Sequence, residues 1–393
     1  MASLVKTLGD FQMAEDCLQD ALLSAFTHWE RSGLPRSPAA WLLQVARRKA
    51  IDRIRRDKSF AVKIPELSYL YELENTPENE EESSVIPDER LQMIFICCHP
   101  ALAEKSRVAL TLRALGGLST DQIAAAFLDT GEAMQRRITR AKQKIKGAGI
   151  AYKIPDAADL PDRLASVLRT LYLIFNEGYS ASSGDALTRV DLSDEAIRLA
   201  RIAAVLMPDE CEVQGVLALM LLHDSRRSAR VGEAGEIVTL EHQNRAQWCR
   251  AKIAEGTAIL QRCLPLGSVG PYQIQAAISG VHAHSIDWAS TDWAQIVDLY
   301  GVLYQIEPTP VVQLNQAVAM CMVGHVEQAA RILNALETDQ NMLSYVPFYM
   351  AQAEVFQRLK QVRRAKEALG KALEHTQNAV EAEHIRGKLG YLH

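Results

Sequence analysis

The sequence has 393 residues, of which 48% are hydrophobic, and carries a formal net charge of −5 at pH 7. That length and apolar content suffice for two or three domains with buried cores. The longest unbroken apolar run, residues 216–222, is far too short to span a membrane, so no membrane partner is expected. The N-terminus lacks the basic-then-apolar pattern of a secretion signal. The seven cysteines have no framework spacing and fit a reducing cytoplasm.

The predicted fold class is all-α. Ala, Leu, Arg and Glu recur at three- and four-residue spacing, whereas alternation of Val and Ile is almost absent. Charge is grouped in blocks: residues 31–58 carry a net +7, residues 59–88 a net −7, and residues 134–146 a net +6. Two basic blocks separated by an acidic spacer predict two DNA-contacting modules joined by a tether.

Residues 1–29 are predicted to form two helices, with Asp10 as the N-cap of the second. Its apolar face is formed by residues at helical spacing, namely Met13, Cys17, Ala21 and Leu22. Its other face is an acidic strip that consists of Glu15, Asp16, Gln19 and Asp20. Such a strip is either a solvated surface or a face that docks another protein.

After a loop at residues 30–38, residues 41–58 have the pattern of a basic amphipathic helix. One side is an apolar stripe of Leu43, Ala50, Ile51 and Ile54. The opposite side carries Arg48, Lys49, Arg55 and Arg56. A merely solvated face usually mixes both signs, whereas here only Asp52 and Asp57 interrupt the cations, so the pattern favours contact with a nucleic acid.

Residues 59–88 contain three prolines and the acidic run 78–82, which predict a flexible linker. Residues 89–149 are predicted to form a second small helical domain that starts with helices at 89–98 and 104–115. The sequence Cys97-Cys98-His99 has no second pair at ligand spacing nearby. Buried small residues are therefore a better interpretation of it than a metal site.

The most diagnostic local pattern is a helix-turn-helix with helices at 120–127 and 131–146. Ser119 is the predicted N-cap of the first helix, with Gln122 at the capping-box position. The second helix is predicted to bury Met134, Ile138, Ala141 and Ile145. Its basic face would then be Gln135, Arg136, Arg137, Arg140, Lys142 and Lys144. A structural helical hairpin is the alternative, but the charge of this helix favours DNA.

The basic character ends at residue 150, and the rest of the chain is predicted to be a helical domain. Helices are expected at residues 163–175, 193–206, 210–223 and 244–261, with a loop or short hairpin before the last. Residues 323–333 and 359–369 superpose at an offset of 36, which aligns Ala329 with Ala365 and Leu333 with Leu369. Such a period is typical of tetratricopeptide-like helix pairs, here from residue 292 to the end.

Taken together, these pieces resemble an extracytoplasmic-function sigma factor of bacterial RNA polymerase. The resemblance is carried by AEDCLQDALLSAF (14–26), PAAWLLQVARRKAIDRIRR (38–56) and RRITRAKQKI (136–145). The segments LYLIFNEGYSASSGD (171–185), EAIRLARIAAVLMPDECEVQGVLALMLLHDSRR (195–227) and NRAQWCRAKIAEG (244–256) look like the group with a fused C-terminal tetratricopeptide-like domain. The implied domains are region 2 at 1–58, an acidic linker at 59–88, region 4 at 89–149 and the C-terminal domain at 150–393.

The resemblance implies two partners, core RNA polymerase and promoter DNA, and no cofactor, metal or catalytic residue. The acidic strip would dock the β′ clamp of the polymerase, and region 4 would lie at the β flap. The −35 element would be contacted by the basic face of residues 131–146. The −10 element would be contacted by Arg36, Trp41, Arg47, Arg48, Lys49, Asp52, Arg53, Arg55 and Arg56. A protein or peptide is the expected partner of the C-terminal domain.

Two other classes of protein remain as alternatives. The first is a helix-turn-helix regulator with a ligand- or peptide-sensing helical domain, which leaves the basic helix and the acidic strip without a purpose. The second is an enzyme that uses the C-terminal histidines and their neighbour, namely His223, Asp224, His242, His282 and His284. These residues lack a nucleophile elbow, metal spacing or a phosphate loop, so structural histidines are the favoured interpretation.

Overall fold

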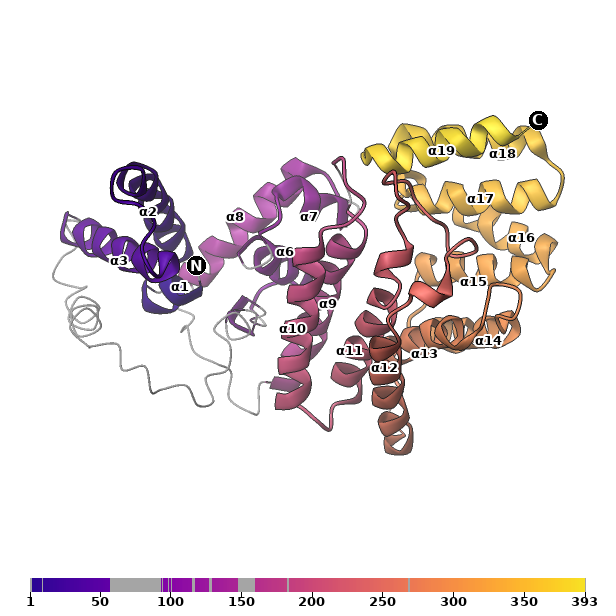
Figure 1. Ribbon diagram of the computed structural model, residues 1–393, viewed down its shortest axis with the longest axis horizontal. Helices are drawn as coiled ribbons and strands as arrows, with labels where there is room; N and C mark the ends of the chain where they lie inside the picture. Colours follow the sequence, from indigo (N-terminus) through magenta and orange to yellow (C-terminus); the bar gives the residue numbers. More distant parts are fainter. Residues whose placement is uncertain are drawn as a thin grey trace. The chain divides into compact units, whose positions relative to one another are not determined.

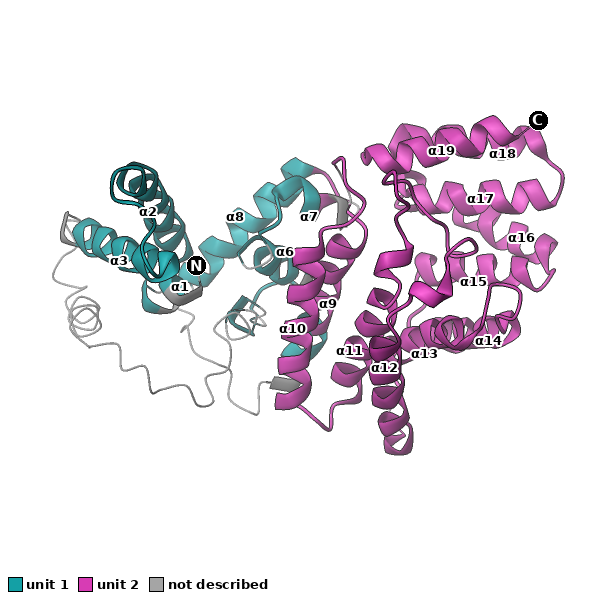
Figure 2. Ribbon diagram, in the orientation of Figure 1, with its two compact units in different colours: residues 1–123, 131–167 teal, residues 124–130, 168–393 magenta. Residues whose placement is uncertain are grey.

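The computed structural model describes residues 2–8, 10–56, 93, 95–97, 99, 101–114, 117–126, 129–147, 160–181, 184–267 and 269–392 (Figure 1). The regular elements in these ranges are helices, and the extended pairings among them are isolated bridges. The all-α prediction is therefore confirmed. Two compact units form: unit 1 is residues 1–123 and 131–167, and unit 2 is residues 124–130 and 168–393 (Figure 2). The predicted linker at 59–88 lies outside the described residues, and the bounds of the four predicted segments stay predictions.

The first part of unit 1 is α1 (Ala2–Leu8), α2 (Phe11–Ser32) and α3 (Pro38–Arg56), which pack on one another. Asp10 is the N-cap of α2, as predicted, because its carboxylate accepts the backbone N–H of Gln12 at 2.8 Å and of Met13 at 3.0 Å. The buried stripe of α2 consists of Phe11, Ala14, Cys17, Ala21 and Ala25.

One apolar residue of α2 is more exposed than the sequence predicts. Leu22 is 42% exposed, although the sequence analysis grouped it with the buried Cys17 and Ala21. Successive residues of an α-helix are turned by about 100° from each other, so Leu22 lies at the edge of the stripe that contains Ala21. On α3 the stripe is as predicted for Ala50, Ile51 and Ile54, and Ala46 joins it in place of the half-buried Leu43.

The second part of unit 1 contains α6 (Glu104–Ala114), the start of α7 (Thr120–Ala126, of which unit 1 holds residues 120–123) and α8 (Gly131–Gly147). The helices α7 and α8 correspond to the two helices of the predicted helix-turn-helix. The capping box is formed: Gln122 N–H donates to Ser119 Oγ at 3.2 Å, and Ser119 N–H donates to Gln122 Oε1 at 2.8 Å. Of the predicted helix at 89–98, residues 93 and 95–97 are described, and they are helical and buried. Cys97 is fully buried, as a small core residue would be.

Unit 2 is a succession of helices. In chain order they are α9 (Leu160–Tyr179, of which unit 2 holds the part from residue 168), α10 (Val190–Leu206), α11 (Cys211–Asp224), α12 (Arg250–Cys263), α13 (Pro271–His284), α14 (Trp293–Ile306), α15 (Pro310–Met322), α16 (Val326–Leu336), α17 (Val346–Arg358), α18 (Val362–His375) and α19 (Ala379–Tyr391). Neighbouring helices pack in pairs, and α11 also lies against α13. A Cβ at Gly215 would lie 2.9 Å from the backbone nitrogen of Gln273, so only glycine fits at this crossing.

Two details of unit 2 bear on the sequence analysis. The predicted helix at 244–261 begins only at Arg250, because the Asn244 side chain accepts the N–H of Ala246 and starts a separate 3-10 turn, η3 (Arg245–Gln247). The aligned repeat positions Ala329 and Ala365 are both fully buried, on α16 and α18. They lie in one hydrophobic core that α15 to α19 share.

Candidate nucleic-acid interface

The helix α8 presents an apolar face and a basic face. Its predicted core residues, Met134, Ile138, Ala141 and Ile145, are each at most 3% exposed. Among the predicted contact residues, Gln135, Arg136, Arg140 and Lys144 are exposed, whereas Arg137 and Lys142 are half-buried. The basic face of α8 is therefore directed away from the core for four of six residues.

The exposed side chains of this face have few partners. Gln135 accepts a hydrogen bond from Thr120 at 3.0 Å, and Arg136 pairs with Glu132 one turn earlier at 3.4 Å. Within the described residues, Arg140 and Lys144 have no ion-pair partner. Cations that water alone solvates are available to a polyanion, since no intramolecular pair has to be broken first.

The basic helix α3 is less uniform. Among the residues predicted to contact the −10 element, Arg48, Asp52 and Arg53 of α3 are exposed, as is Arg36, which precedes the helix. The half-buried members are Trp41, Arg47 and Lys49. The Trp41 ring packs on α2, with its centroid 5.4 Å from those of both His28 and Trp29. Arg55 and Arg56 belong to α3, but their side chains lie outside the described residues.

The acidic strip of α2 is paired with basic side chains of unit 1 in three of its four residues. Arg53 of α3 binds Asp16 at 2.9 Å and Asp20 at 3.3 Å. Lys142 of α8 binds Glu15 at 2.5 Å, with only 18% and 24% of the two side chains exposed. Gln19 is exposed. In the sequence the strip and the basic residues form separate patterns, whereas the fold brings them together.

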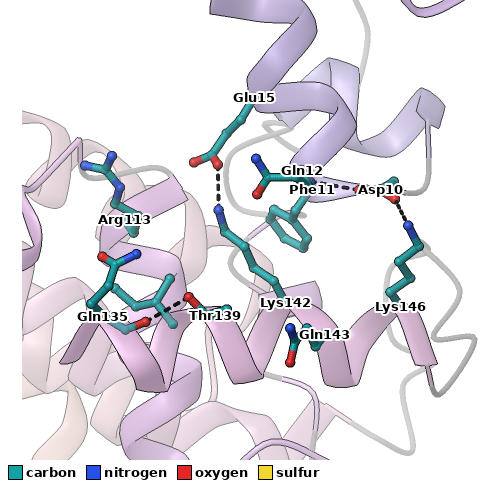
Figure 3. A pocket seen from close by; sticks show the side chains of 11 residues that line it. Asp10, Phe11, Gln12, Glu15, Arg113, Gln135, Thr139, Lys142, Gln143 and Lys146 are labelled. Carbon is teal, nitrogen blue, oxygen red and sulfur yellow. Dashed lines mark hydrogen bonds and ion pairs between the residues drawn. The ribbon is translucent and has the colours of Figure 1, made fainter. Parts of the chain in front are cut away.

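Figure 3 shows where α2 and α8 meet. A pocket of about 430 Å³ lies between them, and both Lys142 and Lys146 extend across it from α8. Lys146 binds the Asp10 carboxylate at 2.8 Å. Burial alone would raise the pKa of Asp10, but the hydrogen bonds from Lys146, Met13 and Gln12 outweigh it and hold that pKa below its ordinary value.

An apolar patch on α2 escaped the sequence analysis. Leu22, Leu23 and Phe26 are 42%, 65% and 76% exposed. Large apolar side chains that lie together on one exposed helix face are typical of a surface that binds another macromolecule. The signal was present in the sequence, since these residues fall beside rather than on the stripe of Cys17, Ala21 and Ala25.

Comparison with known proteins identifies three segments. Residues 2–60 match Sigma-70 region 2, residues 92–145 match Sigma-70, region 4, and residues 163–264 match a Family of unknown function (DUF6596). The first two segments are domains of RNA polymerase sigma factors, the class of protein to which this chain is assigned, and they imply that it binds core polymerase and promoter DNA.

The chain belongs to the same family as an uncharacterized protein of Rhizobium meliloti (strain 1021). The two are 39% identical over 394 residues, which cover 100% of this chain and 93% of the relative. No solved structure matches the chain. In the described part of the chain, no helix combines the length and the apolar character needed to cross a membrane.

Proposed function

We propose that the chain is an extracytoplasmic-function sigma factor whose C-terminal part is a tetratricopeptide-like regulatory domain, and that it acts in the cytoplasm. The observation that carries this proposal is the order of the parts: a helix with an acidic strip, a basic helix, and a capped helix-turn-helix with an exposed basic face. A sigma factor confers promoter specificity on polymerase and catalyses no reaction itself. The domain boundaries proposed from the sequence are 1–58, 59–88, 89–149 and 150–393.

In this proposal α8 enters the major groove of the −35 element. Arg136 and Arg140 suit this role because they are exposed and because a guanidinium can bind a guanine edge with two hydrogen bonds. Lys144 would hold phosphates, which position the helix without reading the sequence. Arg137 and Lys142 are half-buried, so they would have to turn outward to reach DNA.

The −10 element is assigned to α3 and polymerase docking to α2. Arg53 is related to both roles. It belongs to the set predicted to contact the −10 element, and its guanidinium pairs with Asp16 and Asp20 of the acidic strip. We expect this contact to orient the strip for the β′ clamp. Leu22, Leu23 and Phe26 extend the docking face with apolar area, which the strip itself lacks.

For the C-terminal part, the paired helices α15 to α18 and the offset of 36 between equivalent buried residues support a tetratricopeptide-like arrangement. Stacked helix pairs of this kind offer a surface to peptides or proteins. A protein or peptide partner is therefore the proposed ligand of this region.

The decisive test is transcription in vitro with purified core polymerase on a library of genomic promoter fragments. A sigma factor is expected to give discrete start sites preceded by common −35 and −10 sequences. The alternative, a helix-turn-helix regulator with a sensing domain, would bind DNA without core polymerase and would not co-purify with it. Absence of both polymerase association and specific transcripts contradicts the proposal.

A further inference from the structure

Six residues from four segments of unit 2 lie together, although the proposed sigma activity uses none of them. Tyr179 ends α9, His223 lies in the last turn of α11, Arg226 and Arg230 follow α11 on either side of the 3-10 turn η2 (Arg227–Ala229), Trp248 follows η3, and His282 lies in the last turn of α13. These six residues are called the basic–aromatic cluster below.

The contacts within the cluster are specific. Arg226 donates to the Tyr179 hydroxyl at 2.8 Å, and Arg230 stacks on the Tyr179 ring at 3.5 Å from its centroid while it donates to the Tyr179 carbonyl. The His223 ring lies 5.5 Å from the Tyr179 ring, and Arg226 also lies over the Trp248 ring at 5.8 Å. Two guanidinium groups thus share one aromatic wall.

Neither guanidinium has a carboxylate partner among the described residues. The nearest acid in sequence, Asp224, is 2% exposed and is bound to Arg227 and Lys252 instead. A guanidinium has five N–H donors, and Arg226 and Arg230 each use one on a protein acceptor here. Half-buried cations with unused donors are costly unless an anion joins them.

Three further nitrogen atoms of the cluster are buried without a hydrogen-bond partner: Nε1 of Trp248 and Nδ1 of both His223 and His282. Trp248 is only 3% exposed, so its side chain is shielded from bulk water. Its indole nitrogen can only donate a hydrogen bond. The Trp248 indole therefore lacks an acceptor, which agrees with the excess of positive charge in the cluster.

The two histidines are uncharged members of the cluster. Burial lowers the pKa of His282 to about 3, with Arg226 and Arg245 acting in the same direction. Burial also holds the pKa of His223 well below its ordinary value, and Arg226 and Arg230 add to this effect. Both rings are neutral near pH 7, so the charge of the cluster comes from its arginines. Arg245 borders the cluster but is occupied, because it donates to the carbonyls of His282 and Ser285.

We propose that the basic–aromatic cluster is a binding site for a small molecule that carries an oxyanion group, either a phosphate or a carboxylate. The guanidinium groups of Arg226 and Arg230 would hold the oxyanion, and the Trp248 indole N–H would complete its shell of donors. The residues come from the ends of three helices and the segment before α12, so an anion here would tie these segments together.

The test is isothermal titration calorimetry of the full-length protein with sodium phosphate and, separately, with sodium acetate, in sodium chloride of matched ionic strength. Saturable binding of phosphate supports a phosphate ligand, and saturable binding of acetate a carboxylate. Arg226→Gln is expected to raise the dissociation constant of the bound anion at least tenfold. Arg363→Gln removes a guanidinium that is 91% exposed and paired with Glu367, and it should leave binding unchanged.

A second variant separates binding from folding. Trp248→Phe keeps an aromatic ring in the core but removes the unpartnered N–H, and it is expected to weaken binding several-fold with an unchanged circular dichroism spectrum. Arg226→Lys keeps the charge and should bind more tightly than Arg226→Gln. Saturable binding of neither anion by the unmodified protein would overturn the proposal, as would equal affinities in the unmodified protein, Arg226→Gln and Trp248→Phe.

Discussion

The basic face of α8 and the basic–aromatic cluster are both positively charged, but they differ in how far their cations are exposed to water. On α8, Arg140 and Lys144 extend into water, where an unpaired cation costs little free energy. In the cluster, Arg226 and Arg230 lie half-buried against Tyr179, where an unpaired cation is costly. An open row of cations fits an extended polyanion, whereas a converging, partly desolvated set fits a single compact anion.

The largest expected effect concerns the basic face of α8. Replacing Arg136, Arg137 and Arg140 together by Ala should reduce binding to a −35 element by at least about a hundredfold, since each well-placed arginine contributes about 1–3 kcal/mol. Footprinting on a promoter recovered from the transcription assay measures this. The affinity for core polymerase should not change, because these residues lie outside the acidic strip.

Arg363→Ala combined with Arg386→Ala is the matched control, since it removes two exposed cations from α18 and α19. Protection of the −35 element should survive in this variant. Continued protection in the triple α8 variant would show that the recognition helix is assigned wrongly.

The second prediction compares the salt dependence of DNA binding with that of oxyanion binding at the basic–aromatic cluster. If about four phosphates are neutralised, DNA affinity should fall about a hundredfold when salt rises from about 50 to about 200 mM. Oxyanion binding at the cluster should weaken less than about threefold over this range, because buried charges are screened less. Fluorescence anisotropy with duplex DNA and calorimetry with the anion give the two slopes. An equal salt dependence of the two affinities would contradict the distinction between the exposed basic face of α8 and the partly desolvated basic–aromatic cluster.

The third prediction addresses a cation that is already paired. Asp16→Lys with Asp20→Lys should reduce holoenzyme formation about tenfold or more, because like charges across an interface are strongly unfavourable. Both carboxylates bind Arg53, so the variant also sets three cations side by side. Adding Arg53→Glu restores these pairs with reversed sign.

The triple variant is therefore expected to regain thermal stability without regaining polymerase binding. The change in stability should be small, as exposed ion pairs contribute about 0–1 kcal/mol. Native gel electrophoresis with core polymerase measures holoenzyme, and thermal denaturation measures stability. Holoenzyme formation that recovers together with stability would mean that the strip has only a structural role.

The structure agrees with the sequence-based predictions where the determining interactions are local. The periodic core of α8 and the capping box of Ser119 and Gln122 lie within a few residues, and both are present as predicted. The predicted burial of Leu22 is wrong, because this residue lies at the edge of the buried stripe and is exposed. The predicted start of α12 is wrong, because the Asn244 side chain caps a 3-10 turn there instead.

Contacts between distant residues could not be predicted in this way. Glu15 and Lys142 are 127 residues apart, and each belongs to a pattern that is complete without the other. The same holds for Tyr179 and Arg226, which are 47 residues apart and meet only because the ends of α9 and α11 do. Periodicity identifies the face on which a residue lies, but it carries no information about which other face will pack against it.

The smallest expected effect concerns the pair that joins the acidic strip to the basic face of α8. Glu15→Gln keeps the shape of the side chain and removes its charge, which releases Lys142 from its partner at 2.5 Å. DNA affinity should rise about two- to fivefold, as expected for a pair worth about 0.5–1 kcal/mol.

Glu327→Gln, at an exposed position of α16, controls for the altered net charge. In a Lys142→Met background, Glu15→Gln should have no effect on DNA affinity, because the ion pair between residues 15 and 142 is already absent. The four proteins form a double-mutant cycle. Anisotropy titrations of the four proteins give the coupling free energy, and an unchanged or weakened affinity in Glu15→Gln alone would show that this contact does not compete with DNA.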